Sequence, residues 1–121
     1  MLAFAALMAA FSPQDYPHRD WGKVATLSMS VDEAAACIAR TYNRRGGALV
    51  VPAEGGVDID ATSFATIPRG EPWQRFKLRA AGDVTEMRVF FRRPLSAKKT
   101  EKDVRKLGAD CLRISSIDPA A

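Results

Sequence analysis

The stretch Trp73-Gln-Arg-Phe-Lys-Leu-Arg-Ala-Ala-Gly-Asp-Val-Thr-Glu-Met-Arg-Val-Phe-Phe-Arg92 decides the fold of this 121-residue chain. In each half of the stretch, apolar side chains alternate with charged or polar ones. A period of two is typical of a β-strand that buries one face. Gly82 and Asp83, at its centre, are residues that favour a two-residue turn, so the stretch predicts an antiparallel hairpin.

This turn fixes which residues of the two strands lie opposite each other. The expected neighbours are Leu78 with Met87, Phe76 with Val89, Arg79 with Glu86, Arg75 with Phe90, and Lys77 with Arg88. The first two pairs are apolar and the others carry charge, so one face is suited to a core and the other to solvent. A slip of one residue would destroy this separation, and we therefore expect this register.

Two helices flank the hairpin in the sequence. Ser30 and Glu33 form a capping box, a typical start of a helix. The residues that follow place one apolar stripe at helical spacing: Val31, Ala34, Ala35, Ile38 and Tyr42. A second helix is expected to begin near Ser96 or Thr100, with Val104, Leu107 and Cys111 on its apolar side.

The remaining segments complete a sheet. We expect strands over 24–30, 73–80 and 85–92, and one strand interrupted near Pro52 over 48–62. The order is then β-α-β-β-β-α. This order favours an α+β fold, a two-layer sandwich with both helices over one face of an antiparallel sheet.

The first residues predict the compartment of the protein. Residues 2–11 are all apolar, too few to span a bilayer but sufficient for the core of a secretory signal. We therefore interpret 1–12 as a signal peptide, 13–23 as an extended tether, 24–115 as the domain and 116–121 as a disordered tail. This interpretation predicts a periplasmic or secreted protein without a transmembrane span. No lysine or arginine precedes the apolar run, a gap that a translation start assigned too far downstream would explain. The alternative interpretation of the run is an N-terminal helix docked on the core.

The two cysteines, Cys37 and Cys111, lie at or on the apolar stripes of the two helices. If both stripes cover the same sheet face, the sulfur atoms can meet, and in an oxidising compartment we expect a disulfide. Two buried free thiols are the alternative, and they would accompany the docked-helix interpretation of the N-terminus.

The segment Ser30-Val-Asp-Glu-Ala-Ala-Ala-Cys-Ile-Ala-Arg40 resembles a helix of small secreted domains from proteobacteria. In that type of domain an S-x-x-E-x-x-x-C-I helix precedes three strands and a helix with a second cysteine. The resemblance covers roughly residues 24–112. It implies the two-layer fold and an envelope location, and it implies no catalytic activity.

The outer face of the predicted sheet is the candidate binding surface. It combines basic and aromatic residues: Trp73, Arg75, Lys77, Arg79, Arg88, Phe90 and Arg92. The chain carries 18 basic and 14 acidic residues, so it has only a mild preference for anions. Candidate partners are an anionic polymer, a lipid headgroup or an envelope protein. Single-stranded nucleic acid is the partner expected if the protein is intracellular.

Catalytic alternatives have a narrow basis. Asp58 and Asp60 share one face of a strand, as an acid/base pair of a small hydrolase would require, but cross-strand pairing with nearby basic residues is the interpretation we favour. His18, the single histidine, lies in the predicted tether and is interpreted as a solvated side chain. Two distant cysteines and one histidine are too few for a zinc site. We expect no metal, no cofactor and a non-catalytic binding or structural role.

Overall fold

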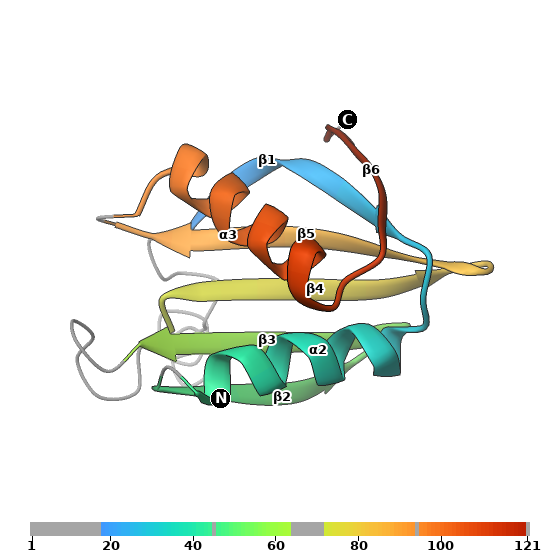
Figure 1. Cartoon of the computed structure of the whole chain (residues 1–121), viewed down its shortest axis with the longest axis horizontal. Helices are drawn as coiled ribbons and strands as arrows, with labels where there is room; N and C mark the ends of the chain where they lie inside the picture. The colour runs from blue at the N-terminus through green and yellow to red at the C-terminus, as the bar shows by residue number, and fades with distance from the viewer. Residues whose placement is uncertain (1–17, 45, 64–71, 94, 121) are drawn as a thin grey trace, which may run out of the picture.

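Six antiparallel strands form one sheet in the order β2-β3-β4-β5-β1-β6 (Figure 1). The computed structural model describes residues 18–44, 46–63, 72–93 and 95–120. Its elements, in chain order, are β1 (His18–Leu27), α2 (Val31–Asn43), β2 (Gly46–Ala53), β3 (Gly56–Ser63), β4 (Gln74–Ala81), β5 (Val84–Arg92), α3 (Ala97–Asp110) and β6 (Ile114–Pro119). The predicted α+β class is confirmed, with two strands more than expected.

The central hairpin, β4 and β5, has the predicted register. All five predicted pairs of neighbours are present, from Arg75 beside Phe90 to Arg79 beside Glu86. Phe76, Leu78, Met87 and Val89 are completely buried. The register is therefore set by the apolar face, which packs against the helices.

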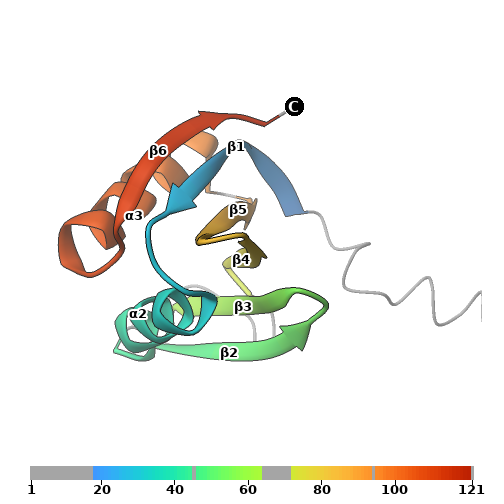
Figure 2. The same ribbon diagram turned by 90° about the vertical axis from the view of Figure 1, so that its right-hand side faces the viewer.

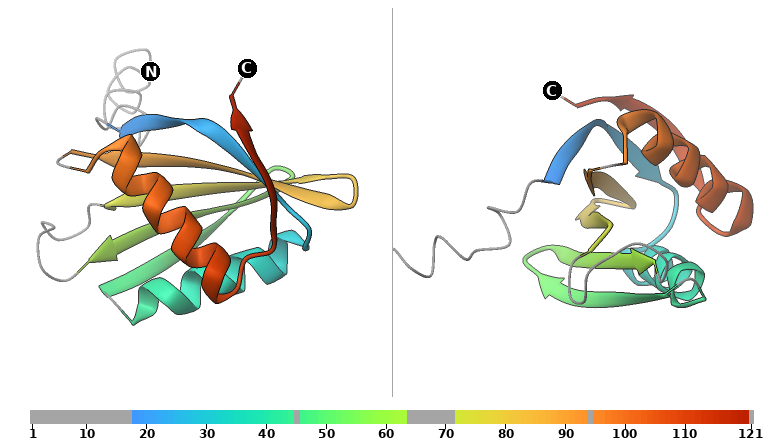
Figure 3. Two further views of the ribbon diagram at one scale, coloured as in Figure 1. Left: turned by 45° about the horizontal axis from the view of Figure 1, so that its top comes forward. Right: turned by 90° about the vertical axis from the view of Figure 1, so that its left-hand side faces the viewer.

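Both helices lie on the same face of the sheet, as Figure 2 and Figure 3 show from opposite sides. Helix α2 packs on β2, β3 and β4, whereas α3 packs on β1 and β5. The capping box of α2 is formed, because the Glu33 amide donates to the Ser30 hydroxyl at 3.1 Å. Helix α3 begins at the first of the two predicted positions, where the Ser96 hydroxyl accepts from the Lys99 amide. Thr100 is buried inside this helix instead of capping it.

A disulfide joins the two helices. Cys37, in the middle of α2, is bonded to Cys111, the C-cap of α3, with a Cα–Cα distance of 5.7 Å. Cys37 is buried and Cys111 is partly buried. The predicted pairing is confirmed, and the alternative of two free thiols is wrong for this structure.

The single interrupted strand expected over 48–62 is a hairpin of two strands. Residues Glu54 and Gly55 form the turn, and β2 pairs with β3 from Ala53 beside Gly56 to Gly46 beside Ser63. Gly55 has a φ of +75°, which favours glycine in such a turn. The sequence pattern was misleading because β2 is an edge strand in which the consecutive residues 49–52 are all exposed, so it shows no alternation.

The ends of the domain also differ from the prediction. Residues 18–23, expected in the tether, form the start of β1, which contains a bulge between Asp20 and Val24. Residues 116–119, expected in a disordered tail, belong to β6, which pairs with β1. Ile114 and Ile117 of β6 pack against the core and stabilise this strand. The predicted domain limits, 24 and 115, are therefore too narrow. The predicted signal peptide and residues 13–17 of the tether lie outside the described residues.

Candidate binding face of the sheet

The face of the sheet opposite the helices carries the predicted binding residues. Because side chains alternate along a strand, the odd-numbered residues of β4 share this face with the even-numbered residues of β5. Six of the seven predicted residues belong to these two strands and lie on this face: Arg75, Lys77, Arg79, Arg88, Phe90 and Arg92. Trp73 stands one residue before β4, and its carbonyl accepts from the Arg92 amide. We call this surface the open face.

Carboxylates from the neighbouring strands hold three of the five cations of the open face. Asp60 of β3 accepts from Arg75 Nε at 2.6 Å and from Nη2 at 3.2 Å. Asp58, two residues earlier on β3, forms an ion pair with Arg79 at 2.8 Å. On the other side of the hairpin, Arg88 forms an ion pair with Asp20 of β1. The face therefore alternates positive and negative charge and does not present an uninterrupted basic surface.

These ion pairs show the cross-strand pairing that is one of the two interpretations of Asp58 and Asp60. Each carboxylate is bound by one arginine of β4, which is the cross-strand pairing expected of opposite charges on adjacent strands. Both carboxylates of the predicted acid/base pair therefore already have a basic partner on the neighbouring strand.

Lys77 and Phe90 form the centre of the open face. The Lys77 ammonium lies 5.1 Å from the centroid of the Phe90 ring, and the Arg88 guanidinium lies 5.8 Å from it. Both distances are within the range of a cation–π interaction. Lys77 makes no ion pair with any residue that the structure describes. Its charge is therefore the one at the centre of this face that a partner can reach without displacing a carboxylate.

His18 lies at one end of the open face, which corrects its predicted position in a solvated tether. It is the first residue of β1, is partly buried and lies beside Arg92 of β5. Burial of the imidazole, followed by the nearby Arg75 and Arg92 guanidinium groups, lowers the pKa of His18 below its ordinary value of 6.5. The imidazole is therefore neutral at neutral pH.

A hollow of about 270 Å³ adjoins this end of the open face, lined by Gly47, Ala48, Leu49, Asp60, Thr62 and Pro72.

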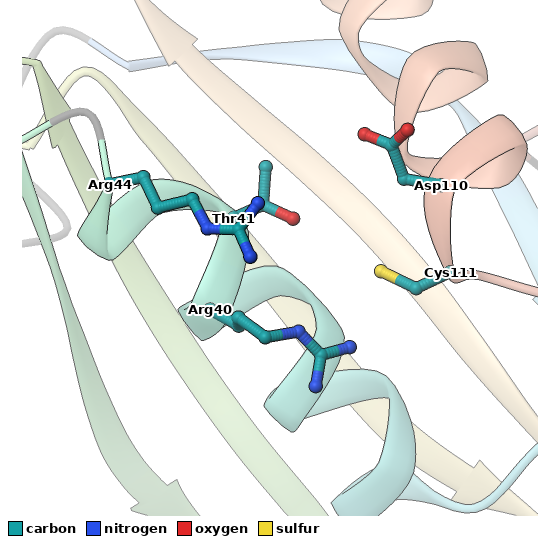
Figure 4. A pocket seen from close by; sticks show the side chains of 5 residues that line it. All are labelled: Arg40, Thr41, Arg44, Asp110 and Cys111. Carbon is teal, nitrogen blue, oxygen red and sulfur yellow. The ribbon is translucent and has the colours of Figure 1, made fainter.

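A pocket of about 350 Å³ lies between the ends of the two helices (Figure 4). Arg40, Thr41 and Arg44 line it from α2, and Asp110 and Cys111 line it from the end of α3. The Thr41 hydroxyl is already used, because it donates to the Cys37 carbonyl at 3.0 Å. The pocket therefore offers two guanidinium groups, one carboxylate and one side of the disulfide. In the sequence, these arginines are explained by their favourable interaction with the dipole at the end of α2. No feature of the sequence therefore indicated a pocket.

A chain of buried polar side chains crosses the core beneath the helices. The Tyr42 hydroxyl of α2 donates to Gln74 Oε1 of β4 at 2.7 Å, and Gln74 Nε2 donates to Asp103 of α3 at 3.0 Å. Lys99 closes the chain at the surface with a 2.8 Å ion pair to the same carboxylate. Gln74 is completely buried, so the chain satisfies groups that would otherwise lack partners. Sequence analysis missed it because a single glutamine in a strand carries no distinctive pattern.

Neither a metal-binding cluster nor a membrane-spanning helix is found in the described part of the chain. No three histidine, cysteine or acidic side chains gather there in a way that could hold a metal ion. No helix among the described residues is both long enough and apolar enough to cross a membrane. We find no significant match of the chain to a protein-family model, a curated protein or a solved structure.

Proposed function

We propose that this chain is a small exported domain, fastened by its disulfide, with a non-catalytic binding or structural role in the cell envelope. The observation that carries the proposal is the bond between Cys37 and Cys111. Structural disulfides form and persist in oxidising compartments, such as the periplasm or the extracellular space, and are rare in the cytosol. The apolar run over residues 2–11 supports the same location, since it has the length of a signal-peptide core.

Export is tested by expressing the complete chain in a bacterial host and separating cytoplasm, envelope and medium. We expect the protein in the envelope or the medium, with a mature N-terminus near residues 10–13 and no thiol that reacts with an alkylating reagent before reduction. An intact Met1 in the cytoplasmic fraction, with two alkylatable thiols, would contradict the proposal.

The open face is the proposed binding surface, and a protein of the envelope is the proposed partner. Three of its four arginines are paired with Asp60, Asp58 and Asp20, so a polyanion would have to compete with three carboxylates. A protein surface of alternating charge avoids this competition, because complementary potentials then meet across the interface. Phe90 adds an aromatic side chain beside these charges, and aromatic residues are enriched in protein interfaces.

Site-specific photo-crosslinking in intact cells tests the surface. A photoreactive residue at Lys77 should form an adduct with an envelope protein, whereas the same residue at the exposed Lys106 of α3 serves as the control. Equal adducts at both positions would contradict the assignment of the face.

Binding to polyphosphate and to phosphatidylglycerol vesicles separates the other partners. We expect weak, salt-sensitive binding that Lys77→Ala and Lys106→Ala reduce equally. Strong binding that only the Lys77 variant loses would favour an anionic polymer or lipid over a protein.

A further inference from the structure

The pocket between the ends of the two helices brings together charges of opposite sign. Arg40 and Arg44 line it from the end of α2, and Asp110 lines it from the last residue of α3. In Figure 4 the charged ends of these side chains point toward one another from opposite walls. All three residues are exposed, and none makes an ion pair with a residue that the structure describes. Two positive charges thus face one negative charge across the pocket.

The disulfide joins the two walls directly beside these charges. The two arginines follow Cys37 by three and seven residues, so all three side chains share one face of α2. Asp110 immediately precedes Cys111, and the Cα atoms of the two cysteines are 5.7 Å apart. Two helices linked by a covalent bond therefore present the charged groups. Side chains on such elements are positioned more precisely than side chains on loops.

The same charges are unfavourable for the folded domain by itself. Arg40 and Arg44 are four residues apart on one helix face, where like charges repel each other. Asp110 lies at the C-terminal end of α3, where the helix dipole disfavours a negative charge. The dipole of α2 accounts for basic residues at its own end, but no interaction within the described residues accounts for Asp110. Residues that break such local rules are typical of functional sites.

From this arrangement we propose that the pocket binds a small zwitterion, either a free amino acid or a short peptide. Arg40 and Arg44 bind its carboxylate, and Asp110 binds its ammonium group. Guanidinium groups match the planar carboxylate and donate charge-assisted hydrogen bonds to it, whereas an ammonium group donates such bonds to a carboxylate. Both unfavourable features of the empty pocket are then relieved by one ligand.

The size and place of the pocket agree with such a ligand. Sites for small molecules have volumes of about 300–1,000 Å³. The pocket, at about 350 Å³, therefore suits a small metabolite and not a macromolecule. It lies between the helices, on the side of the sheet opposite the open face. The proposed site is thus separate from the proposed protein-binding surface.

Nuclear magnetic resonance titration of the complete, oxidised protein with L-alanyl-L-alanine tests the proposal. The amide signals of Thr41 and Cys111 should shift with a dissociation constant of about 1 mM, because the charges of the pocket are exposed. The N-acetylated dipeptide lacks the ammonium group, and the dipeptide amide lacks the carboxylate. Each should bind about fivefold more weakly than the unmodified dipeptide. A parallel titration with L-alanine shows whether a free amino acid or a peptide is the better ligand.

Neutral variants assign the two ends of the ligand. Asp110→Asn should abolish the preference for the dipeptide over its N-acetylated form, because the partner of the ammonium group is lost, and should keep the preference over the amide. Arg40→Gln combined with Arg44→Gln should do the reverse. Lys106→Gln, on α3 but outside the lining of this pocket, is the matched control and should leave all dissociation constants unchanged.

Two results would overturn the proposal. The first is the absence of shifts at Thr41 and Cys111 with about 20 mM dipeptide, in protein that circular dichroism shows to be folded and mass spectrometry shows to be oxidised. The second is equal binding of the dipeptide and its N-acetylated form to the wild-type protein. Equal binding would identify a site for simple anions, in which Asp110 has no part.

Discussion

Removal of the disulfide by the double substitution Cys37→Ala and Cys111→Ala should lower the free energy of unfolding by about 4.5 kcal/mol. The two cysteines are 74 residues apart in the sequence. The chain-entropy relation gives about 4.5 kcal/mol for a loop of this length, because the bond removes conformations from the unfolded chain. Small domains have a total stability of about 5–15 kcal/mol. The loss therefore amounts to a large part of the whole.

Urea titration monitored by tryptophan fluorescence measures this loss, since Trp21 is buried in the core. The alanine variant should unfold at a much lower urea concentration and with a larger m-value, because its unfolded chain is free to expand. A reductant should shift the wild-type midpoint in the same direction and leave the variant unaffected. This comparison separates the loss of the bond from the loss of the sulfur atoms.

A loss below about 1 kcal/mol in the variant, with the bond confirmed by mass spectrometry in the wild type, would refute the loop-closure reasoning. It would mean that the unfolded chain without the bond is already compact, so that the bond removes few conformations.

Three further predictions concern the interior and the open face. Gln74→Leu should cost about 3 kcal/mol in urea titration, because it leaves its buried hydrogen-bond partners in α2 and α3 unsatisfied; a neutral result would show that water replaces the side chain. Gly56→Ala should destabilise more than Gly55→Ala, because a methyl group at residue 56 would collide with the carbonyl of Leu78, whereas residue 55 has open space and bears only the strain of its positive φ; equal thermal midpoints would contradict this. Since the pKa of His18 is lowered in the folded state, stability should fall as the pH drops below 6.5 towards the folded pKa, where the unfolded chain binds the proton more readily; His18→Gln should remove this part of the pH dependence.

The central hairpin and both helices could be predicted because each carries two independent signals. In the hairpin, the turn at Gly82 and Asp83 and the alternation of the flanking residues give the same register. In α2, the Ser30 cap and the apolar stripe give the same start and the same buried face. These elements could be predicted because the local turn or cap residues and the periodicity of the apolar residues indicate the same structure.

The edges of the sheet could not be predicted, because edge strands lack the burial that produces a pattern. In β2 the consecutive residues 49–52 are all exposed, and β6 buries only parts of Ile114 and Ile117. The start of β1 was hidden by Pro13 and Pro17, which indicate a loop, although the strand begins at the next residue, His18. For the same reason the ion pair between Asp20 and Arg88 was missed.

The open face shows how far pattern reasoning reaches for a candidate site. Alternation alone located its residues, because a strand of period two must place Arg75, Lys77 and Arg79 on one side. The charge that a partner meets depended on side chains from other strands, such as Asp20, whose position follows from the sheet order. The residues predicted for this face are mostly basic, whereas the folded surface alternates between positive and negative charge.

The two helices pack on different halves of the sheet, and two separate sets of interactions connect them. Helix α2 covers β2, β3 and β4, whereas α3 covers β1 and β5. The disulfide ties the helices at one point, and the chain from Tyr42 through Gln74 to Asp103 ties them through β4. A covalent bond acts mainly on the unfolded chain, whereas a buried hydrogen-bonded chain acts on the folded one by requiring one arrangement of its partners. The bond therefore supplies stability, and the polar chain fixes how α2 and α3 sit over one face of the sheet.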